Sequence, residues 1–438
     1  MMPSHWIECP RGQSFQAPFT GVAYRCTGCD GLLDADESLK GLSPRTPQAW
    51  KSLFAERAVA KQGAYASGVW SKHELVDRRI DLGNIVSLGE GNTPLLSDLR
   101  LAEAVDVAGL YIKQYGMDRT SSYDALGMSV LASTVSQMVA NGATIDSLAL
   151  LIGSVSEPIR SAVDYCSTLG VGLIAFAPSR GTESASFDQL EKSGARVFML
   201  DADEHDCAFV AREALRDLPV YLAEEAESLY LGGEKTAVME LLQQMEWSVP
   251  DWIVIPYATA RQARAVGRGL LVMHAIGLVE RLPRLALVYE QEHAQFPEHS
   301  CSHENCLSFA QAHTKDGPIL SGPVHQESAC KFLCALDGLI VSTGGEEGFK
   351  VDAIASDLSL SRDALTALGV VLRLRGEQVI GRSESVAILA RAEASAGDRS
   401  GQTGGVPWAM YADRKVDSPL PPDPAAVRER VLRELQEI

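Results

Sequence analysis

Three cysteines near the start of the sequence have the residue type and part of the spacing of a metal site. Cys26 and Cys29 form a C-x-x-C pair within YRCTGCDGLL, and Cys9 precedes them within ECPRGQ. Structural zinc is held tetrahedrally by four thiolate or imidazole ligands. Gly12 stands where a second C-x-x-C pair would place its last thiolate, so a fourth ligand has to come from elsewhere, for example His5. Two interpretations stay open: a zinc site, or a small ribbon stabilised by packing alone.

A carboxylate and two arginines farther along the chain could form a polar pocket. Asp124 stands in DRTSSYDALGM, between an apolar stretch and a long amphipathic one, and Arg160 and Arg261 lie in later segments of similar kind. A carboxylate that faces guanidinium groups can bind a zwitterion or take part in proton transfer. The alternative is that the same residues form an ordinary ion pair or remain surface charges.

The elements that must position these residues follow a repeating pattern. Short β-branched runs alternate with helical stretches from about residue 108 onward. The strands are expected in GLYIKQYG, DSLALLIGS, GLIAFAP, RVFML, DWIVIPY, RLALVYEQ and ESVAILA, and the helices over 122–142, 155–169, 184–194, 203–218, up to 276, and 304–313. Such alternation predicts an α/β fold with mostly parallel sheets covered by helices on both faces.

The end of the chain changes character. Residues 401–424 are rich in glycine and proline, which predicts an irregular connection. Residues 425–438 then carry Val427, Val431, Leu432 and Leu435 at helical spacing, which predicts a C-terminal helix docked on the protein.

Four segments, in order, resemble the threonine synthases, which belong to the fold type II pyridoxal-phosphate enzymes. They are CTGCDGLL, SLGEGNTPLL, GGEKTAVMELLQQMEW and GLVERLPRLALV. The resemblance implies the tryptophan synthase beta-like fold, with two mostly parallel sheet domains around a cleft and a small N-terminal ribbon. It also implies conversion of O-phosphohomoserine to threonine and phosphate, with pyridoxal phosphate held by a lysine as a Schiff base.

The segment that carries this lysine departs from the family pattern. The family reads approximately T-G-S-F-K-D-R-G-M, whereas this chain reads TSSYDALGM from Thr120, which places Asp124 at the lysine. A carboxylate cannot form an imine with an aldehyde, because imine formation needs a primary amine. No lysine lies between Lys113 and Lys192 to replace it locally.

The other positions that the resemblance assigns to the cofactor have also changed. They are Gly153 and Ser154 in the turn that faces the pyridine ring, Ala258, Thr259, Ala260, Arg261 and Gln262 in the phosphate-binding loop, and Ala390 near the pyridine nitrogen. Glycines in such a loop let backbone N–H groups approach a phosphate, and side chains there occupy the same space. We expect Arg261 to fill the former phosphate position and to pair with Asp124 or Glu157.

The positions that correspond to the substrate pocket are mixed. Asn92 and Thr93 match the family. The predicted pocket is completed by Ser121 and Ser122, in the segment that carries Asp124, and by Arg160 in a later segment. Lys235 also matches, and a lysine at a helix start is typically solvated, so we interpret it as a surface residue.

These observations predict four structural units, one of which is built from two separate stretches of the chain. Residues 1–40 form a zinc-ribbon-like segment, residues 41–107 and 223–400 a large α/β domain, residues 108–222 a small α/β domain, and residues 401–438 a linker with the C-terminal helix.

Composition limits the partners. A net charge of −18 argues against surfaces for nucleic acid or anionic membranes, which need clustered lysine and arginine. No long apolar run or secretory signal is visible, which favours a cytoplasmic protein. A small-molecule ligand, a protein partner and a homodimer stay open.

Three functions remain. The first is a pseudoenzyme that has lost Schiff-base chemistry and binds a ligand or partner without a cofactor. The second is an enzyme that works without pyridoxal phosphate in a pocket remodelled around Asp124, Arg160 and Arg261. The third keeps threonine synthase activity and therefore pyridoxal phosphate.

Overall fold

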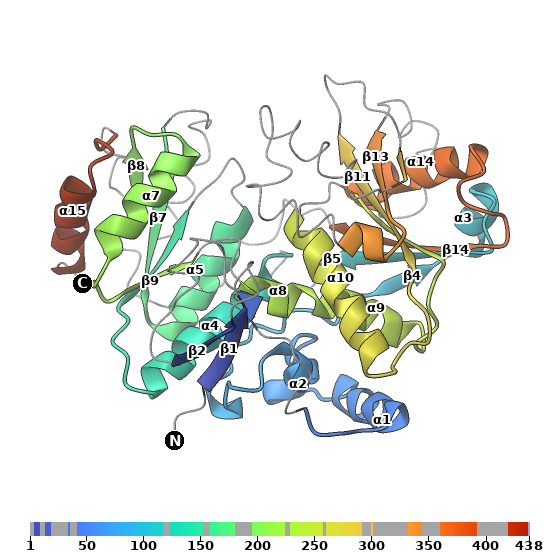
Figure 1. Ribbon diagram of the computed structural model, residues 1–438, viewed down its shortest axis with the longest axis horizontal. Helices are drawn as coiled ribbons and strands as arrows, with labels where there is room; N and C mark the ends of the chain where they lie inside the picture. Colours follow the sequence, from blue (N-terminus) through green and yellow to red (C-terminus); the bar gives the residue numbers. More distant parts are fainter. Residues whose placement is uncertain are drawn as a thin grey trace.

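Two sheets lie in separate halves of the molecule, with helices α4 and α8 between them (Figure 1). The computed structural model describes residues 4–8, 14–18, 34–35, 42–116, 123–151, 157–179, 195–223, 228–256, 260–290, 299–300, 332–343, 360–391 and 419–436. The α/β class with two mostly parallel sheets, predicted from the alternating pattern, is confirmed.

The larger sheet has seven strands in the order β12-β13-β11-β10-β14-β5-β4. Its inner strands are parallel, and the edge strands β12 and β4 run antiparallel to their neighbours. The strands are β4 (Leu95–Ser97), β5 (Gly109–Tyr115), β10 (Trp252–Ile255), β11 (Arg284–Glu290), β12 (His299–Ser300), β13 (Leu339–Thr343) and β14 (Ser385–Arg391).

The smaller sheet has four parallel strands in the order β8-β7-β6-β9. They are β6 (Ser147–Leu151), β7 (Gly172–Pro178), β8 (Arg196–Leu200) and β9 (Val220–Ala223). All seven residues of β7 are buried, as expected for a central strand covered on both faces.

The predicted start of the small domain at residue 108 does not match the sheets. Strand β5 (Gly109–Tyr115) pairs with β14 and β4, so it belongs to the larger sheet. Local sequence identifies a strand but not its partner, and the partner strand β14 begins 276 residues after β5 begins. The smaller sheet begins only with β6.

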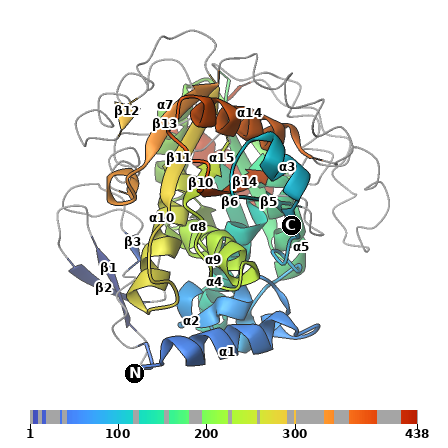
Figure 2. The same ribbon diagram turned by 90° about the vertical axis from the view of Figure 1, so that its right-hand side faces the viewer.

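Helices cover both sheets and fill the space between them (Figure 2). They are α1 (Pro47–Ala58), η1 (Ala64–Ala66), η2 (Trp70–Lys72), α2 (His73–Val76), η3 (Leu82–Asn84), α3 (Leu99–Ala104), α4 (Ala125–Ala140), α5 (Glu157–Leu169), α7 (Glu204–Leu215), α8 (Ser228–Glu234), α9 (Thr236–Gln244), α10 (Ala260–Ala275), α14 (Arg362–Gly376) and α15 (Pro424–Gln436). The helices expected over 184–194 and 304–313 lie outside the described residues.

The predicted C-terminal helix is present as α15 and lies against α7 at the outer edge of the smaller half (Figure 1). Val427 and Val431 are fully buried in the apolar cluster that it shares with α7, whereas Leu432 is 38% exposed. The linker before it, residues 401–418, lies outside the described residues.

A three-stranded antiparallel ribbon begins the chain, with the order β2-β1-β3. Its strands are β1 (Ser4–Glu8), β2 (Ser14–Pro18) and β3 (Asp34–Ala35). Cys9, Cys26 and Cys29 lie outside the described residues, so the zinc site stays a prediction. Within the described parts of the chain, no helix combines the length and apolar character needed to cross a membrane.

Candidate functional site

Two glycines bring the start of α4 against α8. A side chain at Gly233 would overlap the carbonyl of Leu126, and one at Gly127 would overlap the ring of Tyr230. The two helices therefore touch almost backbone to backbone, and this contact brings Asp124, just before α4, close to Glu234 at the end of α8. Replacement of either glycine would push the two carboxylates apart.

The Arg261 guanidinium lies between these two carboxylates. Its Nη2 donates to Asp124 Oδ1, and its Nε lies 2.9 Å from Glu234 Oε1. The guanidinium carbon also lies 5.2 Å from the centre of the Tyr230 ring, within cation–π range. The side chains of Asp124 and Glu234 are 7% and 0% exposed, and that of Arg261 is 17% exposed, so the cluster is largely removed from water.

The predicted pairing of Arg261 with Asp124 is confirmed. Sequence reasoning missed Glu234, and the side chain of the other proposed partner, Glu157, is not among those described. Glu234 precedes Lys235 in a charged pair that is typical of a solvated helix end, which gave no sign of its burial. Lys235 itself is 3% exposed, so its interpretation as a surface residue is wrong.

The structure brings together only part of the predicted site. Gln262 is buried beside Arg261 on α10. The side chains of Arg160 and Ala260 are not described, and several predicted residues lie outside the described ranges: Ser121, Ser122, Gly153, Ser154, Ala258 and Thr259.

Ala390 is not brought into this cluster. It packs in the apolar core shared by the larger sheet and α14, together with Ile112. Tyr115, three residues beyond Ile112 along β5 and so on the opposite face, packs in the other core with Tyr230. Because side chains alternate across a strand, an alignment error of one residue places a side chain on the opposite face of the sheet.

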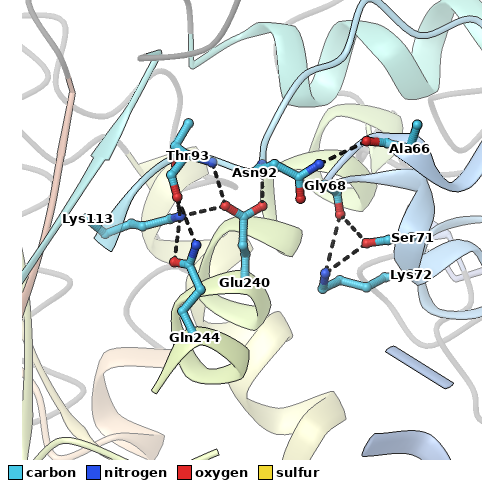
Figure 3. A network of polar contacts seen from close by, with 9 residues as sticks. All are labelled: Ala66, Gly68, Ser71, Lys72, Asn92, Thr93, Lys113, Glu240 and Gln244. Carbon is cyan, nitrogen blue, oxygen red and sulfur yellow. Dashed lines mark hydrogen bonds and ion pairs between the residues drawn. The ribbon is translucent and has the colours of Figure 1, made fainter. Parts of the chain in front are cut away.

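A second buried ion pair joins β5 to α9 (Figure 3). Lys113 Nζ lies 2.5 Å from Glu240 Oε1 and 2.8 Å from Gln244 Oε1, and it also donates to the carbonyl oxygen of Thr93. Three acceptors match the three N–H groups of an ammonium. The lysine is thus fully engaged by its neighbours, which suits a structural role.

The predicted substrate residues Asn92 and Thr93 are tied to this pair by their backbone. Their amide nitrogens donate to the Glu240 carboxylate at 2.7 and 2.8 Å, and the Asn92 side chain donates to the carbonyl of Ala66 at 2.9 Å. Asn92 adopts a positive φ of 53°, a conformation that asparagine tolerates better than most residues. In the described structure these contacts fix the loop, and a substrate role stays a prediction.

Glu90 in the same loop is a further buried carboxylate that sequence reasoning did not single out. It is fully buried and accepts from Ser129 Oγ at 2.9 Å and from Tyr165 Oη at 2.6 Å. The contacts join the loop to α4 and α5. The signal that could have found it is its place in SLGEGNTPLL, between glycines that bring the loop into the interior.

Similarity to known proteins agrees with this architecture. The family described as "Pyridoxal-phosphate dependent enzyme" matches residues 86–310, just over half of the chain. The chain is also 31% identical over 387 residues to "Threonine synthase 2, chloroplastic" of Arabidopsis thaliana, a match that covers 85% of this chain and 72% of that protein. The chain belongs to the threonine synthase family of pyridoxal-phosphate-dependent enzymes. This confirms the resemblance found in the four ordered segments.

More distant members and solved structures extend the comparison. "Threonine synthase" of Methanosarcina acetivorans is 26% identical, and the match covers 60% of this chain and 60% of that protein. A fungal L-serine ammonia-lyase from Rhizomucor miehei superposes with a TM-score of 0.52 at 16% identity, over 68% of this chain and 93% of the lyase. Diaminopropionate ammonia lyase from Escherichia coli gives a TM-score of 0.51 at 13% identity, over 69% and 85% of the two chains. These structures show the shared fold alone.

Proposed function

We propose that this member of the threonine synthase family has lost Schiff-base chemistry and serves as a scaffold that binds a small molecule or a protein partner. The observation that carries the proposal is the Arg261 guanidinium, which pairs with Asp124 at the position aligned with the family lysine. An imine needs a primary amine, and position 124 supplies a carboxylate. The residues at this position do not fit covalently held pyridoxal phosphate.

The charge arrangement supports the same proposal. A phosphate ester that entered near Arg261 would meet Asp124 and Glu234, which already contact the guanidinium. Breaking a buried pair leaves an uncompensated charge, which typically costs about 3–5 kcal/mol. This cost supports the proposal that the arginine fills the site in place of offering a free cation to an anionic cofactor.

The two other functions make different demands on the site. An enzyme without pyridoxal phosphate would use the Asp124–Arg261 pair for substrate binding or proton transfer, with Arg160 as a further cation. Retained threonine synthase activity would need an amine from another part of the chain. We also propose a cytoplasmic location; the word "chloroplastic" belongs to the name of the plant relative.

An absorbance titration tests the proposal directly. Purified protein would be mixed with increasing pyridoxal phosphate and scanned for the imine band, with a threonine synthase that retains its lysine as the positive control. We expect no band at stoichiometric cofactor. A saturable band from the unmodified protein would contradict the proposed loss of Schiff-base chemistry and would favour retained activity.

A further inference from the structure

A small cavity lies next to the Lys113–Glu240 pair, apart from the contacts of Arg261. The end of β5, the start of α4, helix α9 and the loop at residues 91–93 enclose it. Its room of about 10 Å³ suits one group the size of a water molecule, and the empty space amounts to about 250 Å³ when the opening to solvent is included. The lining residues are Gly91, Thr93, Lys113, Tyr115, Gly116, Tyr123, Leu126, Ala237 and Glu240.

One hydroxyl group of this cavity is buried without a partner. Tyr115 is 5% exposed, and its Oη makes no hydrogen bond within the part of the chain that the structure describes. A buried hydroxyl without a partner is destabilising, because it has lost its hydrogen bonds to water and gained none in return. Such a group in a cavity wall points to a ligand that completes its hydrogen bonding.

Two further residues with hydroxyl groups, Tyr123 and Thr93, line the same cavity. The rings of Tyr115 and Tyr123 are tilted against each other, with centroids 5.1 Å apart. Thr93 bonds to Lys113, Glu240 and Gln244 through its backbone. The cavity thus combines three hydroxyl-bearing side chains with two aromatic rings.

The charges around the phenols leave room for a cation, because the Lys113 ammonium in the same wall is already paired with Glu240 at 2.5 Å. Burial first, and then the carboxylates of Glu240 and Glu234, hold the pKa of Tyr115 well above its usual range. Burial and Glu234 likewise raise the pKa of Tyr123, an effect that Arg261 opposes. The phenols therefore stay neutral, and carboxylates that disfavour a phenolate equally disfavour an anionic ligand.

We infer that this cavity binds the ammonium group of a small primary amine, held by the hydroxyl oxygens of Tyr115, Tyr123 and Thr93. An ammonium group has the size of a water molecule and carries three N–H donors, which three hydroxyl oxygens can accept. The tyrosine rings add cation–π attraction. The opening to solvent leaves room for the carbon chain of the amine. This site goes beyond the proposed function, because it requires neither the presence nor the loss of a Schiff base.

Thermal-shift titrations of the full-length protein without pyridoxal phosphate test the inference. The probes are ammonium chloride and methylammonium chloride, each against sodium chloride and potassium chloride at equal ionic strength. We expect a saturable rise in Tm with the two ammonium salts alone. Equal stabilisation by sodium or potassium would overturn the assignment.

Tyr115→Phe removes the unpartnered hydroxyl and keeps the ring. Without ligand, we expect this variant to be at least as stable as the unmodified protein, because a buried polar group without a partner is gone. Methylammonium should bind it about five- to tenfold more weakly, the loss of roughly one hydrogen bond. Tyr111→Phe, on the same strand outside the cavity, is the matched control and should bind as the unmodified protein does.

Thr93→Val provides a second variant that keeps the backbone bonds of the loop. Unchanged methylammonium affinity in both Tyr115→Phe and Thr93→Val would overturn the inference. An imine band in the titration with pyridoxal phosphate would contradict the proposed function and leave this result untouched, so the two failures are distinguishable.

Discussion

Two buried ion clusters lie close together in this protein and differ in how their charges are arranged. In one, Lys113 meets Glu240, Gln244 and the carbonyl of Thr93. In the other, Arg261 lies between Asp124 and Glu234. The first joins β5, α9 and a loop within the larger half of the molecule, whereas the second joins the starts of α4 and α10 to the end of α8.

Under the proposed function, the difference separates the framework of the fold from the site of the lost chemistry. The partners of Lys113, namely Thr93, Glu240 and Gln244, stand in the family-matching segments SLGEGNTPLL and GGEKTAVMELLQQMEW. The Arg261 cluster joins Glu234, from the second of these segments, to the position aligned with the family lysine and to a position aligned with the phosphate-binding loop. On this proposal, Asp124 and Arg261 mark the place where the family cofactor would bind, while the Lys113 cluster holds elements of the larger half together.

Lys113→Met gives the largest expected effect, since it leaves the buried Glu240 carboxylate without its cation. We expect a loss of about 3–5 kcal/mol in the free energy of unfolding at neutral pH, measured by urea denaturation. Glu240→Gln is the partner variant. The double variant should lose clearly less than the two single losses together, because the pair is coupled. Additive losses would show that Lys113 and Glu240 act independently. This result would contradict the interpretation of the Lys113 cluster as framework.

Lys72→Met sharpens the comparison, because Lys72 is a buried lysine near Glu240 with a poorer set of acceptors. Its Nζ donates to Ser71 Oγ at 2.9 Å and reaches the carbonyl of Gly68 only at 3.4 Å. Burial lowers the pKa of Lys72 from 10.5 to about 8, partly offset by Glu240. A shift of this size corresponds to roughly 3 kcal/mol of destabilisation while the lysine is charged, and the hydrogen bond to Ser71 offsets about 1 kcal/mol.

The direction in which Lys72 makes stability depend on pH follows from proton binding. Between the folded pKa of about 8 and the unfolded value of 10.5, the unfolded chain binds more protons, so this lysine makes stability rise with pH. At pH 7 we therefore expect Lys72→Met to be about 2 kcal/mol more stable than the unmodified protein. The gap should close as the pH rises through that interval, measured by chemical denaturation at several pH values. A gap that does not change with pH would contradict the assignment.

The sequence revealed the fold more fully than the site. Apolar runs such as GLIAFAP and LALV identify buried strands because a strand covered on both faces needs a continuous run of apolar residues. The pairing of β5 with β14 could not be read in this way, since it depends on residues far apart in the chain. The C-terminal helix was predictable because Val427 and Val431 repeat at helical spacing.

Within the site, the sequence revealed the changed residues but not all of their partners. Asp124 and Arg261 could be paired because they align with the lysine and the phosphate-binding loop of the family, which both hold the same cofactor. Glu234 and Glu240 look like ordinary helix carboxylates, and their burial results from the close contact of α8 with α4 and from the loop that folds over α9. Side-chain charge alone does not distinguish a solvated carboxylate from a buried one.

The most direct test of the central claim is borohydride trapping in the Asp124→Lys variant. The variant and the unmodified protein would be incubated with stoichiometric pyridoxal phosphate, reduced, and analysed by intact mass and peptide mapping, with Asp124→Lys/Arg261→Gly as a comparison. The account predicts no stable yellow species in any of the three, and no stoichiometric reduced adduct at a single lysine of the unmodified protein, because an amine at position 124 does not rebuild the phosphate site. A stable stoichiometric yellow complex of Asp124→Lys, or a stoichiometric adduct mapped to one lysine of the unmodified protein, would contradict it.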